Sequence, residues 1–283
     1  PYQVIDGNWT RISKITGKPY LISSFSEENF DEMLGYTERL GFYSIYHSHP
    51  FDTWGHFDLL KNLFPNGREG MRSCVEKAKA KNIRVGVHTL TNFITTNDPF
   101  VTTEANSGLM AAGISILQAD IDDKATEIIV DNYEYFAQVS TLNSVLIGNE
   151  IIRYREVTKD KPHKLMYCIR GAYDTKAVPH KKGDQVKKLM DFLYKTLFPD
   201  WEMQNELIQN LADFFNDTGV SHMDFDGHEG TCYTGRGEYA TNYFAEEFIK
   251  KVDHLVVNGS SNINHYYWNI NSYINWGEPW YAS

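Results

Sequence analysis

Gly219-Val220-Ser221-His222-Met223-Asp224-Phe225-Asp226-Gly227-His228-Glu229-Gly230 is the stretch from which the fold is predicted. Its apolar residues indicate a buried strand, and Asp224 and Asp226 alternate along it, so both carboxylates leave the same face. Gly227 ends the strand, and His228 and Glu229 follow at once. A single aspartate here would be interpreted as a strand cap. Four ionisable groups so close together favour a functional site, because burying them for structure alone is costly.

The flanking sequence alternates between strand and helix patterns. Strands are predicted at 18–25, 42–46 and 83–88, separated by helical spacing of apolar residues. After a long interruption, a helix at 201–217 precedes the opening strand, and a helix at 239–251 precedes a strand at 255–258. The segment 265–281 is expected to hold one more strand. This βαβ order favours a parallel sheet with right-handed crossovers.

The interruption has a different pattern, with short β-rich runs at 127–130, 144–147, 150–155 and 164–170. We therefore expect three parts: residues 1–114 as the first part of a β/α barrel, 115–184 as an inserted antiparallel β subdomain, and 185–283 as the continuation of the barrel. The polar segment 170–183 is expected to be a structural hairpin. The predicted fold class is α/β, a TIM-type (β/α)8 barrel with the insertion after strand 3. About six βα steps are recognisable where a closed barrel needs eight, so we expect the barrel to be incomplete at the C-terminus.

The composition of the chain excludes some classes of binding partner. The net charge is −10, which argues against nucleic acid, since phosphate binding needs a positive field. No run of 18 apolar residues predicts a membrane span. Three widely spaced cysteines give neither a disulfide framework nor a Cys-x-x-Cys metal motif, and we expect buried thiols and no cofactor. The sequence gives no oligomeric state.

In a β/α barrel, active groups lie at the C-terminal ends of strands. This rule selects polar residues after five of the predicted strands as candidates for the site: His47, His49, His88, Asn92, Asp224, Asp226, His228, Glu229, Asn258 and Glu278. Glycoside hydrolysis requires two carboxyl groups, one to protonate the leaving oxygen and one to attack the anomeric carbon or activate water. Asp226 or Asp224 as nucleophile and Glu278 as acid/base fit that division. Trp54 and Trp276 are expected to stack on sugar rings.

The arrangement resembles the retaining α-glycosidase barrels, the α-galactosidase-like and α-glucosidase-like enzymes. The resemblance rests on a β insertion after the third strand, an aspartate ending the fourth and an acid near the sixth. In those enzymes the fourth-strand aspartate of a Lys-x-Asp motif is the nucleophile. Here the corresponding strings are His222-Met-Asp224 and Asp224-Phe-Asp226, without the lysine, which leaves the choice of aspartate open. Asp226 is preferred because it lies nearer the strand end.

The Asp-Gly-x-Glu string at 226–229 and Trp-Gly-Glu-Pro-Trp at 276–280 also resemble carbohydrate-active barrels from polysaccharide-degrading bacteria. The resemblance implies an oligo- or polysaccharide substrate and, for a polysaccharide, a secreted or periplasmic location. His47, His49, His88, Asn92, His228, Glu229 and Asn258 would then be substrate contacts.

Two other functions stay open. His47-Ser-His49 has the spacing with which amidohydrolase-type barrels bind zinc, which predicts a metal-dependent hydrolase. The aromatic residues would also suit a non-catalytic carbohydrate-binding barrel, although the strand-end carboxylates would then be surplus.

Overall fold

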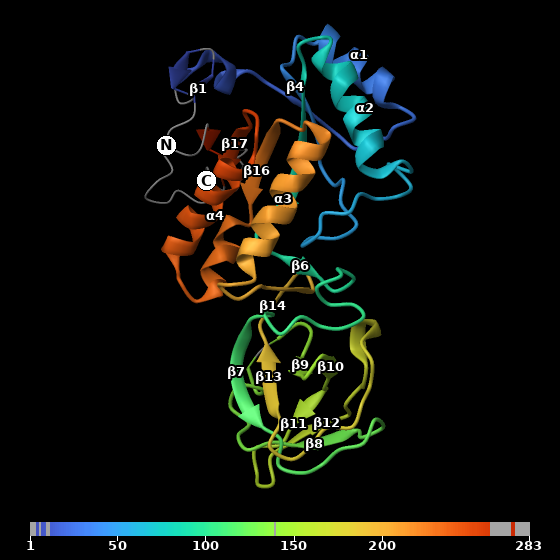
Figure 1. Ribbon diagram of the computed structural model, residues 1–283, viewed down its shortest axis with the longest axis vertical. Coiled ribbons are helices and arrows are strands. Elements are labelled where there is room, and N and C mark those ends of the chain that lie inside the picture. Colours follow the sequence, from blue (N-terminus) through green and yellow to red (C-terminus); the bar gives the residue numbers. More distant parts are fainter. Residues whose placement is uncertain (1–3, 6, 10–11, 139, 261–272, 275–283) are drawn as a thin grey trace, which may run out of the picture. The chain divides into compact units, whose positions relative to one another are not determined.

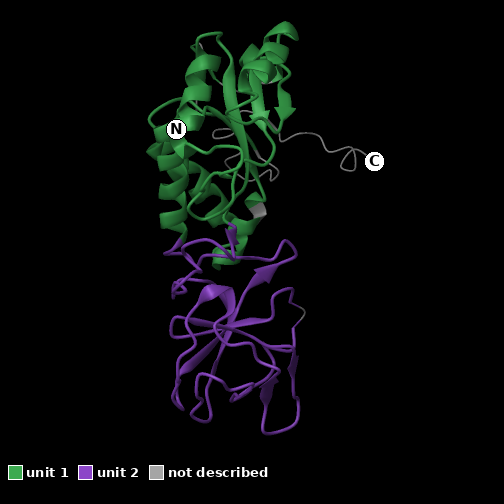
Figure 2. Cartoon of the chain, turned by 90° about the vertical axis from the view of Figure 1, so that its right-hand side faces the viewer, with its two compact units in different colours: residues 1–92, 204–283 green, residues 93–203 purple. Residues whose placement is uncertain are grey.

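The computed structural model describes residues 4–5, 7–9, 12–138, 140–260 and 273–274 (Figure 1). The chain divides into two compact units, residues 1–92 with 204–283, and residues 93–203 (Figure 2). Unit 1 carries the α/β pattern and unit 2 is built from short antiparallel strands. In the chain, unit 2 comes between two strands that are neighbours in the sheet of unit 1.

The centre of unit 1 is a six-stranded sheet in the order β18-β17-β16-β5-β4-β3, with every neighbouring pair parallel. The order is linear, so among the described residues the sheet is open and a (β/α)8 barrel is not closed. The six strands are β3 (Leu21–Ser23), β4 (Ser44–His47), β5 (Arg84–Leu90), β16 (His222–Asp226), β17 (Val257–Ser260) and β18 (Tyr273–Ile274).

Within the part of the chain that the structure describes, four helices pack on one face of this sheet through a core of buried apolar side chains. Phe215 of α3 and Phe248 of α4 both contribute to this core, in which Phe225 and Met223 of the sheet are also buried. Gly219 has a φ of 75° directly after α3, a left-handed conformation that suits glycine and ends the helix there. The helices are α1 (Phe30–Arg39), α2 (Gly67–Lys79), α3 (Gln204–Thr218) and α4 (Glu238–Lys251).

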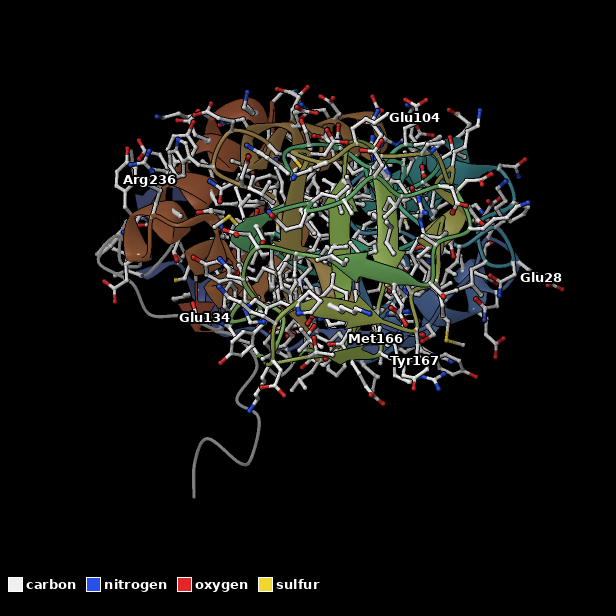
Figure 3. The ribbon with its side chains drawn as sticks, turned by 90° about the horizontal axis from the view of Figure 1, so that it is seen from below. Glu28, Glu104, Glu134, Met166, Tyr167 and Arg236 are labelled. Atoms are coloured by element: carbon white, nitrogen blue, oxygen red, sulfur yellow. The ribbon has the colours of Figure 1, made fainter. Side chains whose placement is uncertain are left out.

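Shorter elements complete unit 1. They are the pair β1 (Val4–Ile5) and β2 (Asn8–Trp9), with the 3-10 helices η2 (Lys14–Gly17) and η4 (His228–Thr234). Charged side chains such as Glu28 of this unit and Glu134 of unit 2 are exposed (Figure 3). Within the described ranges, none of the helices has the length and apolar character that crossing a membrane requires.

Unit 2 has its own core, in which Ile128, Ile147 and Leu165 are fully buried. Its four-stranded sheet extends to β13, past the boundary expected at residue 184, because Val186 and its neighbours pair antiparallel with β7 and β9. The strands are β6 (Ile94–Thr95), β7 (Ala111–Ile116), β8 (Glu127–Ile129), β9 (Ser144–Ile147), β10 (Glu150–Arg153), β11 (Glu156–Val157), β12 (Lys164–Met166), β13 (Gln185–Leu189), β14 (Asp191–Phe192) and β15 (Thr196–Leu197), with the 3-10 helix η3 (Ala172–Asp174).

Candidate functional site

The strand β16 presents its acidic residues on one face. Met223 and Phe225 pack into the core under the helices, and the alternation of side chains therefore sends His222, Asp224 and Asp226 to the opposite face. The register places Asp224 beside His88 of β5. The predicted common orientation of the two carboxylates thus brings them together with a histidine from the neighbouring strand.

Asp226 is held at the carboxyl end of the sheet by three contacts. His88 donates from Nε2 to Oδ2 at 2.9 Å, and the amide of Gly227 donates to Oδ1 at 2.9 Å. The backbone carbonyl of Asp226 accepts from the amide of Thr91 at 2.7 Å. The side chain of Asp226 is 28% exposed, so its carboxylate is both fixed and reachable from solvent.

Asp224 lies one step deeper and is fully buried. Tyr46 on β4 lies close enough to this carboxylate for the two groups to interact electrostatically. Burial raises the pKa of Tyr46 well above its ordinary value, and the negative charge of Asp224 raises it further. Tyr46 therefore stays neutral, and Asp224 lies buried beside it, beneath the more exposed Asp226.

A layer of rings and hydroxyls lies below the two aspartates. Ser44 contacts Nδ1 of His222 at 2.8 Å, and the Tyr43 hydroxyl lies 3.5 Å from Nε2. The ring of Tyr20 meets His222 edge-on, with 4.7 Å between the ring centroids. Burial, with a smaller effect from the nearby charge of Arg84, lowers the pKa of His222 to about 3, so this imidazole is neutral. His222 is thus a buried, neutral ring held by contacts inside the protein.

His47 belongs to the core and not to the site. Its side chain is fully buried between the rings of Phe25 and Phe64. Nε2 donates to the carbonyl of Phe25 at 2.8 Å, and Nδ1 accepts from the amide of His49 at 3.0 Å. Burial lowers the pKa of His47 to about 4. Because both nitrogens are used inside the protein, the expected sugar contact is corrected to a packing role.

His49 and Trp54 lie together on the loop after β4. His49 is exposed and Trp54 is half-buried against the core under the helices. Their rings meet edge-on at 6.3 Å between centroids. Both side chains can be reached by a ligand from solvent.

Asn92 and His228 fix the loop that follows β16. Asn92 is fully buried with a φ of 65°, and its Nδ2 donates to the carbonyl of Gly230 at 3.3 Å. His228 stacks on Phe225 and donates from Nε2 to the carbonyl of Thr241 at 2.9 Å. Burial lowers the pKa of His228 to about 4. We therefore correct both expected substrate contacts to structural residues of this loop.

The remaining predicted residues are placed as follows. Asn258 of β17 is paired in register with Met223, so it shares the helix-facing side rather than the face of Asp224. Glu229 lies in η4, where only its backbone is described. Trp276 and Glu278 lie outside the described residues.

Sequence reasoning missed Tyr46 and the layer around His222. The alternation of side chains along a strand could have identified them. His222 lies two residues before Asp224 and therefore on the same face of β16, and Ser44 and Tyr46 share a face of β4 in the same way. The phase of that strand could not be derived, because Phe42-Tyr43-Ser44-Ile45-Tyr46 has no clear alternation of polar and apolar residues.

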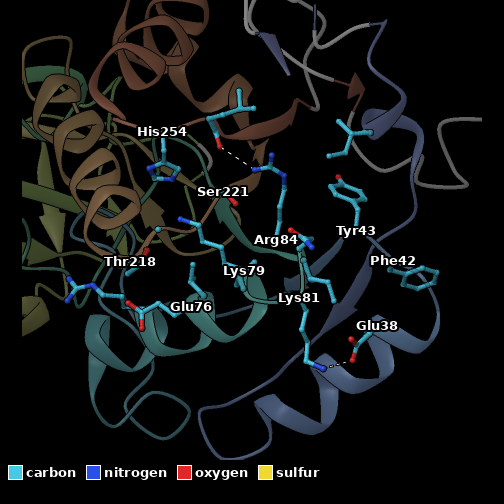
Figure 4. A pocket seen from close by; sticks show the side chains of 18 of the residues that line it. Glu38, Phe42, Tyr43, Glu76, Lys79, Lys81, Arg84, Thr218, Ser221 and His254 are labelled. Atoms are coloured by element: carbon cyan, nitrogen blue, oxygen red, sulfur yellow. Dashed lines mark hydrogen bonds and ion pairs between the residues drawn. The ribbon is translucent and has the colours of Figure 1, made fainter. Parts of the chain in front are cut away.

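A cavity of about 1030 Å³ lies at the opposite, amino ends of the strands (Figure 4). Tyr43, Arg84 and Ser221 line it, together with Lys79 and Lys81 at the end of α2. Lys81 is paired with Glu38 across this cavity. The lining includes neither aspartate, so the cavity is separate from the candidate site.

A metal site gains no support from the geometry. No three His, Cys, Asp or Glu side chains gather in a way that could hold a metal ion within the part of the chain that the structure describes. The zinc alternative needs a ring nitrogen of His47, and the packing of His47 leaves none. The cysteines are free, with Cys74 and Cys168 buried as expected and Cys232 half-buried.

Comparisons with known proteins find similarity only in structure. No protein-family model and no curated protein sequence matches the chain. Trehalulose synthase MutB from Pseudomonas mesoacidophila MX-45 matches with a TM-score of 0.50 and 14% identity, over 88% of this chain and 45% of that chain. A MutB variant in complex with glucose gives the same values. The α-galactosidase TtGalA from Thermus thermophilus, in complex with stachyose, has a TM-score of 0.48 and 10% identity, over 86% of this chain and 40% of that chain.

The chain thus spans less than half the length of the structures it matches. Its parallel α/β sheet shares part of its fold with MutB, so the resemblance to α-glycosidase-type barrels predicted from the sequence is confirmed at the level of fold.

Proposed function

We propose that the chain is a retaining glycoside hydrolase in which Asp226 is the nucleophile and Glu278 the acid/base. The observation that carries the proposal is the position of Asp226: an oriented, partly exposed carboxylate at the carboxyl end of a central parallel strand. Asp224 is less suited to attack a substrate, because its carboxylate is fully buried. Its proposed role is to hold Tyr46 and the floor of the site.

The proposed reaction has two steps. An oxygen of Asp226 attacks the anomeric carbon while the glycosidic C–O bond breaks, and the leaving oxygen takes a proton from Glu278. Water then attacks the glycosyl–Asp226 ester, gives its proton to Glu278 and releases the sugar and the carboxylate. The sugar complex of MutB, whose fold this chain shares in part, supports a carbohydrate substrate.

Other assignments are proposals that follow from position. His49 and Trp54 are proposed substrate contacts because a ligand can reach both on the loop after β4. Trp276 is retained as a stacking residue beside Glu278. Residues 93–203 are proposed to be an insertion in a barrel-type domain, because the strands before and after them are adjacent in the sheet.

The test is turnover of a panel of 4-nitrophenyl glycosides by the wild-type chain, Asp226→Asn and the matched surface control Asp31→Asn. Asp31 is paired with Lys77 on the surface of unit 1. Removing a nucleophile costs on the order of 10⁴-fold or more in kcat, so Asp226→Asn should be inactive and Asp31→Asn unchanged. Full activity of Asp226→Asn would refute the assignment. Sugar binding without turnover in the wild type would favour the non-catalytic barrel.

A further inference from the structure

The contact between His88 and Asp226 crosses from one strand to the next. His88 is in register with Asp224, yet its Nε2 reaches forward to Oδ2 of Asp226 at 2.9 Å. The imidazole is 16% exposed, and its other nitrogen, Nδ1, is buried. The ring therefore presents its accessible donor to the carboxylate and not to the space where a substrate would lie.

We infer that His88 is a positioning residue that orients the nucleophilic carboxylate of Asp226, rather than a contact to the sugar. The inference rests on the proposed function of Asp226. Each carboxylate oxygen has its own donor, since Oδ1 accepts from the amide of Gly227 and Oδ2 from His88. Because each oxygen has its own donor, the carboxylate group cannot rotate freely about its Cβ–Cγ bond.

This orientation affects the chemical step more than binding. A nucleophile held in its reactive orientation does not need to be ordered during the reaction, so losing one holder lowers kcat. A hydrogen bond to a charged group has a strength that corresponds to roughly 10- to 100-fold in rate. The substrate gains or loses no direct contact with His88, so KM should stay within about twofold.

Two variants of His88 separate positioning from other roles. The side-chain amide nitrogen of glutamine reaches the place of imidazole Nε2, whereas that of asparagine lies near the place of Nδ1. His88→Gln should therefore keep the donor to Asp226 and most of kcat, and His88→Asn should lose 10- to 100-fold in kcat at nearly constant KM. A sugar contact would instead raise KM. A residue needed only for packing would lower the thermal midpoint of both variants together with activity. Either result, or an unchanged kcat in His88→Asn, would overturn the inference.

A second measurement does not depend on turnover. In ¹⁵N NMR of histidine-labelled protein, we expect Nε2 of His88 to carry a proton and its resonance to shift in Asp226→Asn but not in Asp31→Asn. An unprotonated Nε2, or a resonance unaffected by Asp226→Asn, would refute the contact itself. If the NMR result holds and Asp226→Asn keeps full activity, the proposed function fails. If Asp226→Asn is inactive and His88→Asn is not impaired, only the positioning role fails.

Discussion

Glu150 at the start of β10 organises the predicted hairpin segment of unit 2, and its replacement by glutamine should destabilise the protein strongly. The carboxylate is 1% exposed and accepts from Nε and Nη2 of Arg170 at 2.8 and 2.7 Å. It also accepts from His180 at 2.7 Å and from the amides of Gly171 and Val178 at 2.9 and 3.2 Å. One side chain thus closes the segment from Arg170 to His180.

The size of the effect follows from these contacts. Burial alone would raise the pKa of Glu150, but the hydrogen bonds from His180, Arg170 and the two amides outweigh it and hold the pKa at about 2. Relative to an ordinary value near 4.5, this corresponds to about 3 kcal/mol in favour of the folded state. Removing one member of a buried ion pair costs about 3–5 kcal/mol, which agrees. Glu150→Gln should therefore lower the free energy of unfolding by about 3 kcal/mol.

Urea unfolding of the full chain at pH 7 measures this loss. Glu127→Gln is the matched control, because Glu127 forms an ion pair with Lys164 in the same unit at 2.8 Å, with its side chain 47% exposed. That variant should lose less than about 1 kcal/mol. The pKa of Glu150 is depressed in the folded state, so its stabilisation is present above about pH 4.5 and is lost as the pH falls towards 2. A loss below about 1 kcal/mol in Glu150→Gln would refute the assigned role of the carboxylate.

Two further predictions concern unit 1. A Cβ on Gly86 would lie 2.5 Å from Cδ2 of Tyr46 and 2.9 Å from Nδ1 of His222. Gly86→Ala should therefore lower the free energy of unfolding by about 1–3 kcal/mol, whereas the control Gly35→Ala, on open helix surface, should not lower it. Equal thermal midpoints of the two variants would contradict the close packing around Gly86. The buried imidazoles of His47, His222 and His228 stay neutral in the folded protein, whereas in the unfolded chain they take up protons below about pH 6.5. As the pH is lowered below that value, each should reduce the free energy of unfolding by up to about 1.4 kcal/mol per pH unit. His228→Gln should reduce this slope between pH 7 and 5 by about a third, and an unchanged slope would show that His228 is not buried neutral.

Local patterns predicted much of the fold in unit 1. The apolar spacing located all four helices, and the strand at 220–226 was placed with the correct alternation, because Asp224 and Asp226 are separated by one apolar residue that must face the core. The six parallel strands follow the predicted order of βα steps. An incomplete (β/α)8 barrel was expected from about six recognisable βα steps, and the described residues form an open sheet of six parallel strands.

The site was predicted less completely, because it depends on the phase of strands and on loops. His47 was selected because it ends a strand, but it follows Tyr46 by one residue and so faces the opposite side. His228 comes after Gly227, whose φ of 63° turns the chain and directs the ring back onto Phe225. No sequence pattern encodes that turn. Likewise, the meeting of Glu150 with Arg170 and His180 joins positions far apart in the chain.

In the proposed mechanism, Asp226 forms a covalent ester with the sugar. Incubation of the full chain with a fluorinated glycosyl fluoride, chosen to match the sugar preferred in the glycoside panel, should trap that ester, and mass spectrometry of the digested protein should locate it. We expect an adduct on the peptide that contains Asp226, absent from Asp226→Asn and present in Asp31→Asn. An adduct on any other residue, or turnover of a matched substrate with inversion and without an adduct, would contradict it.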